Sequence, residues 1–192
     1  MSKSERTRQR IQATAVQLFT EDGYDAVTVD RIASAAGVSH MTFFRYFPSK
    51  DAVLLDDPYD PVIADAVAAQ PADRSPLERA CRGILDAWAL IPETDLGDVR
   101  TRLRIVAAHP RLRARMWENT LRTQEAVAAA LAEPGTRRLE AAVAAGACMG
   151  ALMAALTDWA ETGDEALGNR IASALHQLAP EASPSRQSRE VP

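Results

Sequence analysis

The chain has 192 residues and a net charge of −4 at pH 7, with 47% apolar and 25% charged residues. This balance excludes a disordered or collagen-like chain and is typical of one large or two small globular domains. Two cysteines, Cys81 and Cys148, are too few for a disulfide framework in a chain long enough to form its own core. Because no basic segment followed by an apolar run opens the sequence, we expect no secretion signal and a cytoplasmic protein.

The charge is distributed unevenly along the chain. The first 50 residues carry seven basic and five acidic side chains, which leaves a net charge of −6 for the rest. A basic end in an acidic protein favours a polyanionic partner at that end, such as DNA.

Four helices, the last three of them short, are predicted in the first 56 residues, from apolar positions at helical spacing and from the residues that begin and end each segment. Thr28 and Ser39 are favourable N-caps for the second and third helices, and Gly37 can adopt the left-handed conformation that ends the second. The expected ranges are about 4–22, 29–36, 41–46 and 50–56.

Six longer helices are predicted after Pro58, because the Pro and Gly breaks are more widely spaced there. No segment alternates with period two for long enough to form a strand, so the fold class is all-α. The expected ranges are about 61–70, 76–91, 96–108, 110–132, 137–161 and 164–178.

An uncharged run of 17 residues, Ala141 to Thr157, is at the lower limit for crossing a membrane. Ala and Gly make up most of it, and the acidic residues Glu140 and Asp158 flank it. We therefore expect a helix buried in a helical bundle and no membrane contact.

Residues 28–54 have the pattern of a helix-turn-helix, in which two short helices cross at a tight turn around Gly37. The second helix would enter the major groove of duplex DNA by its N-terminal end. There His40 and Thr42 can hydrogen-bond to base edges, and Met41 can contact the methyl group of thymine.

Phosphate contacts are expected from four residues around the recognition helix: Thr28, Arg45, Tyr46 and Lys50. An aromatic run on so short a helix is also typical of core packing, which we expect for Phe43 and Phe47. For Phe44 and Tyr46 packing and DNA contact remain equal alternatives.

This stretch resembles the N-terminal motif of the tetracycline-repressor (TetR) family over about residues 4–56. The matching residues keep the spacing of the family without a gap: Thr28, Val29, Ile32, Ala33, Ala36, Gly37, Val38, Ser39, Thr42, Tyr46, Phe47, Ser49, Lys50 and Leu54. Met41 stands where the family usually has glycine, and Phe44 stands where it usually has a tyrosine that contacts phosphate. The resemblance places Ser39, Met41 and Phe44 beside the other DNA-facing residues.

The resemblance implies a three-helix DNA-binding domain at 1–56 and a larger helical ligand-binding and dimerisation domain at 57–179. The Pro- and Ser-rich residues 180–192 are expected to be a disordered tail. A homodimer would bind a palindromic double-stranded DNA operator, in most such proteins as a repressor, and a small-molecule effector would release it. No cofactor and no metal is implied.

Gly146, Gly150 and Ala154 form a row of small residues along which a partner helix could approach, with packing inside the chain as the alternative. Eight residues could line an effector pocket, and packing in the core is the alternative for the apolar ones. They are Trp88, Leu103, Arg104, Met116, Trp117, Met149, Leu152 and Met153.

Six arginines and no acid lie between Arg100 and Arg115. Residues 100–117, together with residues 43–54, also resemble the branch of the family that contains the mycofactocin-associated regulator, which implies an acyl-CoA-like effector. Guanidinium groups beside an apolar pocket would suit the phosphates and acyl chain of such a ligand, although most arginine runs are solvated faces.

We expect no enzyme, because the sequence has no nucleophile set, phosphate-binding glycine loop or metal-ligand cluster, and its three histidines are far apart. One alternative function is a helical acyl-CoA-handling protein that does not bind DNA. Another is a thiol redox sensor using Cys81 or Cys148, which is disfavoured because both lie in apolar helical segments where thiols are usually unreactive.

Overall fold

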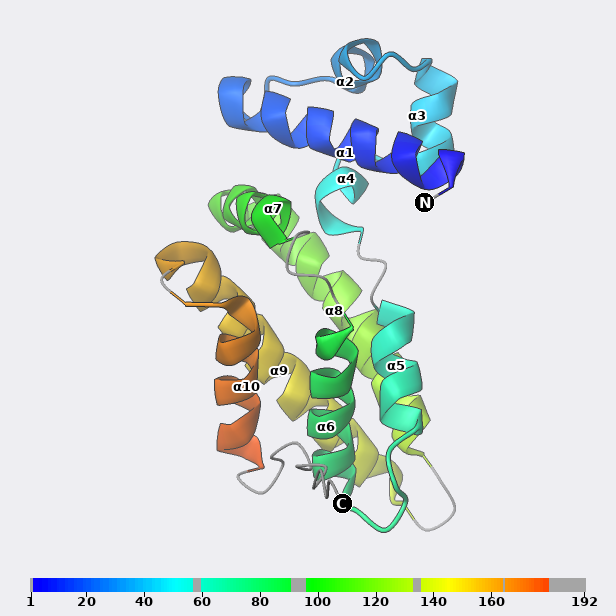
Figure 1. Cartoon of the computed structure of the whole chain (residues 1–192), viewed down its shortest axis with the longest axis vertical. Helices are drawn as coiled ribbons and strands as arrows, with labels where there is room; N and C mark the ends of the chain where they lie inside the picture. The colour runs from blue at the N-terminus through cyan, green and yellow to red at the C-terminus, as the bar shows by residue number, and fades with distance from the viewer. Residues whose placement is uncertain (1, 57–59, 91–95, 133–135, 164, 180–192) are drawn as a thin grey trace, which may run out of the picture. The chain divides into compact units, whose positions relative to one another are not determined.

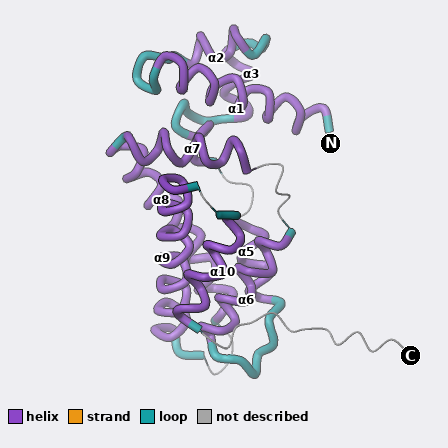
Figure 2. Tube along the Cα trace, turned by 60° about the vertical axis from the view of Figure 1, so that its left-hand side comes forward, coloured by secondary structure: helices purple, strands orange, loops and turns teal. Residues whose placement is uncertain are grey.

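The computed structural model describes residues 2–56, 60–90, 96–132, 136–163 and 165–179. In these ranges every regular element is an α-helix and no strand is present (Figures 1 and 2). The helices are α1 (Lys3–Asp22), α2 (Val29–Ala35), α3 (His40–Tyr46), α4 (Ala52–Leu55), α5 (Asp60–Ala68), α6 (Pro76–Ala89), α7 (Leu96–Ala108), α8 (Pro110–Leu131), α9 (Arg138–Thr162) and α10 (Leu167–Leu178). The all-α fold class is confirmed, and the expected disordered tail lies outside the described residues.

The starts of two helices differ by two residues or more from the sequence prediction. Ser49 does cap a turn, because its Oγ accepts the N–H of Ala52 at 3.2 Å, but Lys50 and Asp51 form that turn and α4 begins only at Ala52. The start of α10 is three residues later than expected, for a reason that lies in its tertiary contacts and is described below.

The chain folds into two compact units. Unit 1 comprises residues 1–58 and 92–119, and unit 2 comprises residues 59–91 and 120–192. The predicted boundary at residue 56 lies close to the end of the first segment of unit 1. Residues 92–119, however, group with the N-terminal helices in the structure, whereas the sequence analysis assigned them to the C-terminal domain.

The core of unit 1 is formed by the N-terminal helices together with α7 and the start of α8. Phe43 and Phe47 are fully buried in it. Val106 of α7 and Leu112 of α8 belong to the same cluster. Burying a large apolar side chain contributes about 1.5–3 kcal/mol, so the two later helices are part of what stabilises the N-terminal unit.

The turn between α2 and α3 has the predicted glycine. Gly37 has φ +63°, and the N–H groups of Gly37 and Val38 bond to the carbonyls of Ser34 and Ala33 at 3.1 and 2.9 Å. This pair of bonds satisfies the last carbonyls of α2 and lets the chain reverse direction into α3.

Unit 2 is a bundle of α5, α6, α9, α10 and the remainder of α8, in which α6 packs against α5, α9 and α10. Gly83 lets α5 and α6 approach closely, because a Cβ at this position would lie 2.6 Å from the Cα of Val67. In this unit α8 and α9 run antiparallel: Thr120 donates to the sulfur of Met153 at 3.5 Å, and Gly146 faces the side chain of Gln124.

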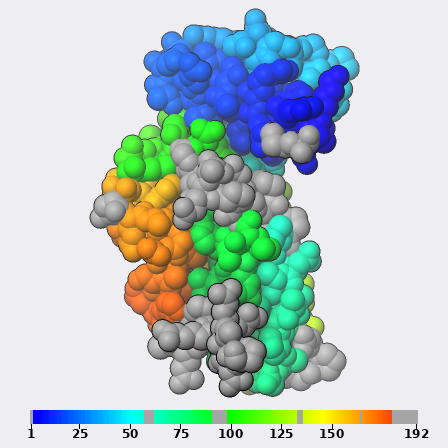
Figure 3. Space-filling model, in the orientation of Figure 1, coloured from blue at the N-terminus to red at the C-terminus, as the bar shows by residue number. Residues whose placement is uncertain are grey.

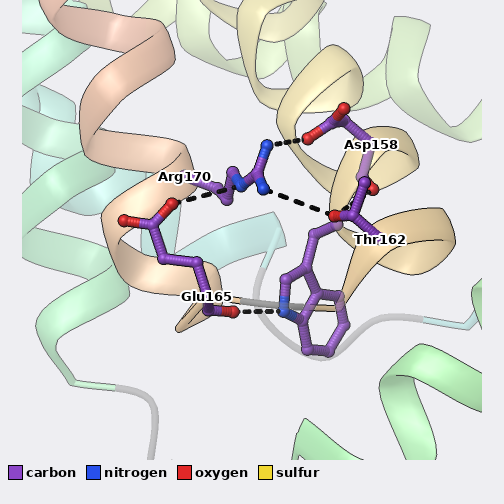
Figure 4. Close-up of polar contacts among 5 residues, drawn as sticks. Asp158, Thr162, Glu165 and Arg170 are labelled. Atoms are coloured by element: carbon purple, nitrogen blue, oxygen red, sulfur yellow. Dashed lines mark hydrogen bonds and ion pairs between the residues drawn. The ribbon is translucent and has the colours of Figure 1, made fainter.

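A polar network fixes the turn between α9 and α10 (Figure 4). The guanidinium of Arg170 pairs with Asp158 and with Glu165, whose carboxylate lies 3.2 Å from Nε. Trp159 Nε1 donates to the backbone carbonyl of Glu165 at 2.9 Å. The carbonyl and the carboxylate of Glu165 are thus both held in the turn by these contacts. Helix α10 therefore begins only at Leu167.

Helix α9 is long and apolar enough to cross a membrane by length and composition, and it is the only such helix among the described residues. One such helix is weak evidence, since core helices of soluble proteins pass the same test. The expectation of burial is only partly right: one face packs in the bundle, whereas Leu139 and Val143 are 68% and 61% exposed. The helix therefore has a second apolar face that is open in the single chain.

Candidate nucleic-acid interface

Helix α3 has one buried face and one exposed face. Phe43 and Phe47 point into the core of unit 1, which leaves the other side of the helix outward. Met41 is 83% exposed, and Phe44 is 42% exposed. Large apolar side chains are normally withdrawn from water, so an almost fully exposed methionine beside an exposed phenylalanine indicates a contact surface.

The start of α3 is held by a hydrogen-bonded cap. Ser39 Oγ accepts the N–H of Thr42 at 3.1 Å, and the two hydroxyl groups lie 2.9 Å apart. The Ser39 side chain is therefore part of the framework that fixes the first turn. Thr42, a predicted base contact, is half-buried and shares its hydroxyl with this cap.

His40 lies between two neighbours on the outward side of unit 1. Its Nε2 is 3.5 Å from Oδ1 of Asp30 in α2, and its ring packs against that of Phe44 at a tilt of 59°, with centroids 4.8 Å apart. These contacts orient the imidazole, and a DNA base that hydrogen-bonds to Nε2 has to replace Asp30.

The C-terminal end of α3 lies against the N-terminal end of α1 (Figure 1). Ser4 Oγ donates to the hydroxyl of Tyr46 at 3.4 Å, and this hydrogen bond lowers the pKa of Tyr46. The exposed guanidinium of Arg45 lies 5.2 Å from the centre of the Tyr46 ring. Tyr46 is thus partly packed and partly available, with the cationic side chain of Arg45 beside it.

The first turns of α1 add basic residues that the sequence analysis did not assign to DNA. Lys3, Arg6 and Arg10 are exposed. In the space-filling view α1 and α3 contribute neighbouring parts of one surface, coloured dark blue and light blue (Figure 3). The excess of basic residues in the first 50 positions could have indicated α1 as well as α3.

The structure gives Lys50 a role within the protein. Its ammonium donates to the carbonyls of Tyr24 and Val27 at 2.8 and 2.9 Å and lies 4.1 Å from the centre of the Tyr24 ring. Lys50 therefore holds the loop between α1 and α2, which positions the exposed Thr28 at the start of α2. Two of its three N–H donors are used in this way, which leaves one for a phosphate.

Next to Lys50, Asp51 joins three parts of unit 1. The Tyr24 hydroxyl donates to Oδ1 of Asp51, and Arg115 of α8 donates to Oδ2 at 2.8 Å. The His109 ring packs edge-on against Tyr24 at 5.2 Å. Burial raises the pKa of Asp51, but the hydrogen bonds from Tyr24 and Arg115 together lower it more, so its pKa lies below the usual value. Sequence patterns gave no signal for this network, because its members are 27 and 64 residues apart.

The predicted pocket residues are divided between the two units. Leu103, Arg104, Met116 and Trp117 belong to unit 1, where Arg104 and Trp117 are exposed and Met116 packs against the core. Trp88, Met149, Leu152 and Met153 belong to unit 2, and the last three are buried. Of the six arginines, Arg115 binds Asp51 and Arg113 donates to the carbonyl of Ala107 at 2.7 Å, both within unit 1.

The predicted dimerisation residues do not all have the same surroundings. Gly150 and Ala154 are exposed, and a Cβ at Gly150 would meet nothing within 4 Å. Gly146 instead faces Gln124 of α8, and a Cβ added at Gly146 would lie 3.5 Å from its Nε2. The exposed stripe of α9 continues through Leu139 and Val143, which the prediction did not include.

Comparison with protein families identifies both parts of the chain. The profile of the bacterial regulatory proteins of the tetR family matches residues 11–56, and the profile of the MftR C-terminal domain matches residues 74–183. The chain belongs to the TetR family. The predicted resemblance is confirmed, including the branch, and the matched families are regulatory proteins rather than enzymes.

Two curated TetR relatives show the range of similarity. The chain is 33% identical over 110 residues to MftR of Mycobacterium tuberculosis, which is named as a regulator of mycofactocin biosynthesis; the match covers 56% of this chain and 55% of MftR. It is 38% identical over 78 residues to the regulator TcmR of Streptomyces glaucescens, covering 40% of this chain and 34% of TcmR. The chain thus matches only between a third and about half of the length of these relatives.

Solved structures of TetR proteins share the fold. SmeT of Stenotrophomonas maltophilia, the repressor of a multidrug efflux pump, aligns with a TM-score of 0.58 at 15% identity over 92% of this chain and 90% of SmeT. FadR of Thermus thermophilus, in complex with lauroyl-CoA, aligns with a TM-score of 0.53 at 23% identity over 96% of this chain and 99% of FadR.

We predict that Asp51→Asn lowers the free energy of unfolding by about 1–2 kcal/mol at pH 7, because the partly buried hydrogen bond from Tyr24 and the exposed one from Arg115 lose their charged acceptor. Since the folded-state pKa of Asp51 is lowered, its stabilising effect is present above the unfolded pKa of about 3.9 and is lost as the pH falls through the folded value. Urea unfolding at pH 7 and at steps below pH 5 measures this difference.

The matched control is Asp73→Asn, a change at an exposed carboxylate of unit 2. It should leave the unfolding free energy within about 0.5 kcal/mol of wild type. If the difference in unfolding free energy between wild type and Asp51→Asn stays constant down to pH 3, the charge of Asp51 has no stabilising role.

Proposed function

We propose that this TetR-family regulator binds a palindromic DNA operator as a homodimer, represses transcription, and is released by a small apolar or acyl-CoA-like effector. The observation that carries the proposal is the outward face of α3, where Met41 and Phe44 are exposed although the helix is anchored from behind by Phe43. A short, rigidly held helix with an exposed face is the element that a helix-turn-helix inserts into a major groove. The regulator would act in the cytoplasm, where the chromosome lies.

The side chains of α3 divide into base readers and phosphate contacts. Met41 offers an apolar contact to a thymine methyl group, while His40 and Thr42 offer polar contacts that are already oriented by Asp30 and Ser39. The contacts to the phosphate backbone would come from Thr28, Arg45, Tyr46 and Lys50, together with the basic start of α1, while Phe44 can offer only an apolar contact to the DNA.

A dimer is part of the proposal because one seven-residue helix contacts only a few base pairs. Two copies can read half-sites about 34–36 Å apart, or a multiple of that distance. The exposed apolar stripe on α9, which includes Gly150 and Ala154, supports pairing of subunits through this helix. An effector that prefers another separation of the two reading helices would lower the DNA affinity by the amount of that preference.

The acyl-CoA class of effector is supported by two comparisons. The C-terminal match is to the MftR domain, and a protein of the same fold has been solved with lauroyl-CoA. The buried Met149, Leu152 and Met153 supply adaptable apolar surface in unit 2, which suits an acyl chain.

We predict that Met41→Ala and Arg45→Gln weaken DNA binding in different ways. Met41→Ala should lower affinity for the operator about tenfold and leave binding to unrelated duplex unchanged, because it removes a base contact. Arg45→Gln should lower both affinities and reduce the slope of log affinity against log salt by about 0.9, because it removes a phosphate contact. Fluorescence anisotropy at several salt concentrations, on an operator obtained by genomic selection and footprinting, measures both.

Arg138→Gln is the control for loss of one positive charge, since Arg138 is exposed at the start of α9 in unit 2. It should change neither affinity nor salt slope. The proposed role of α3 in reading bases is wrong if wild-type protein binds no duplex in competition with unrelated DNA. It is also wrong if Met41→Ala weakens binding to all DNA sequences equally.

We predict that Val143→Glu converts the dimer into a monomer, because it places an unpaired charge on the exposed stripe of α9 that would be buried between subunits. Operator affinity should fall by at least a hundredfold, since one half-site contributes only part of the binding energy. Ser173→Glu, at an exposed position of α10, is the matched control and should remain dimeric. Sedimentation equilibrium gives the mass of each variant. A Val143→Glu protein with the mass of the wild-type dimer would exclude this face of α9 as the dimer interface.

We predict that lauroyl-CoA raises the melting temperature of the protein by about 5–10 °C at a hundredfold excess over its dissociation constant and releases operator DNA. Coenzyme A alone and laurate alone test which half of the ligand supplies the binding. Absence of both a thermal shift and DNA release with the intact thioester would rule out this effector class while leaving DNA binding untouched.

A further inference from the structure

The two cysteines of the chain meet in the core of unit 2. Cys81 of α6 and Cys148 of α9 are both free and fully buried, and their sulfur atoms lie 3.4 Å apart. From the apolar sequence around each cysteine alone, both thiols are expected to be unreactive. Contact with a second thiol changes that expectation, because an oxidised cysteine then has a partner for disulfide formation within reach.

We propose that Cys81 and Cys148 form a reversible redox pair, in which a peroxide converts the two thiols into a disulfide that joins α6 to α9. The proposal depends only on the packing of unit 2 and is independent of DNA binding. It assigns a modification site to the bundle, with peroxides as the oxidants and dithiols as the reductants.

The distance between the sulfur atoms favours a bond. A disulfide has an S–S length of about 2.05 Å, so the sulfurs have to approach by only about 1.4 Å. Helices α6 and α9 pack directly against each other, and the neighbouring buried residues Ala80, Ala144 and Ala145 are small. A rotation of the two side chains, with a small shift of the helices, is therefore sufficient.

The environment makes Cys81 the first residue to react. Its hydrogen bond with Cys148 lowers the pKa of the Cys81 thiol, although burial acts in the opposite direction, and the same hydrogen bond raises the pKa of Cys148. Since the thiolate is the nucleophile, Cys81 attacks the peroxide and Cys148 supplies the second sulfur.

The chemistry balances in two steps. The Cys81 sulfur attacks one oxygen of hydrogen peroxide, the O–O bond breaks, and Cys81 becomes a sulfenic acid while the other oxygen leaves as water with the thiol proton. The Cys148 sulfur then attacks the sulfenic sulfur, the S–S bond forms, and the S–O bond breaks. The hydroxide takes up the proton of Cys148 as a second water, so two thiols and one peroxide give one disulfide and two waters.

Burial determines the rate and the product. Because both sulfurs are fully buried, peroxide reaches them only during local opening of the bundle, so oxidation is slow compared with that of an exposed thiol. Once the sulfenic acid has formed, Cys148 is already in contact with it. Disulfide formation is therefore expected to precede further oxidation to sulfinic acid.

The disulfide would also change the stability of unit 2. Cys81 and Cys148 are 67 residues apart, so the cross-link closes a long loop in the unfolded chain and lowers the entropy of that state. A loop of this length is expected to raise the melting temperature by about 10 °C in a chain of this size.

The test is treatment of the intact reduced protein with hydrogen peroxide. Denatured samples are analysed by thiol titration, by intact mass and by peptide mapping, and native samples by thermal unfolding. We expect loss of both thiols, a mass lower by two hydrogen atoms, a peptide pair joining Cys81 to Cys148, and a rise in melting temperature of about 10 °C that dithiothreitol reverses.

Cys81→Ala and Cys148→Ala are the matched variants, and alanine is used because a serine hydroxyl in this apolar core could prevent folding. Each variant should keep its fold, form no intramolecular disulfide and show no thermal shift on oxidation. Two intact thiols in treated wild-type protein, a sulfinic acid on either cysteine, or disulfides only between chains would overturn the proposal.

Discussion

The burial of Phe43 and Phe47 determines how unit 1 presents its outward surface. Helix α3 has seven residues, which is too short to be stable by itself in water. Its helical state depends on these two rings in the core and on the Ser39 cap at its start. Because both rings lie on one side, the opposite side, with Met41, is necessarily outward.

That core is completed by residues from far along the chain. Val106 and Leu112 are buried in the same cluster, and Arg115 binds Asp51, so the N-terminal helices depend on α7 and the start of α8. Helix α8 then continues into unit 2 as a single element. A change in the position of the first turns of α8 would therefore alter these contacts within unit 1 directly.

The parts of the structure that could be predicted are those determined by neighbouring residues. The Gly37 turn, the Ser39 cap and the inward side of α3 follow from local sequence, and the structure has all three. The start of α10 could not be predicted, because it depends on the contacts of Trp159 and Glu165 across a turn. The Asp51 network and the contact of the two cysteines could not be predicted for the same reason. The sequence gives each side chain, but only the fold determines which distant side chain lies next to it.

A motif match identifies a residue by its position in the sequence. It does not show which interactions the side chain of that residue already makes in the folded protein. Lys50 matches the family motif, yet its ammonium already donates to two backbone carbonyls, and His40 lies beside Asp30. For either residue to bind DNA, an existing interaction has to be shared or replaced, which reduces the net free energy of the new contact. Met41 has no polar partner to lose, and 83% of its surface is exposed in the single chain. Under the proposed function, discrimination between operators should therefore depend more on Met41 than on the polar residues around it.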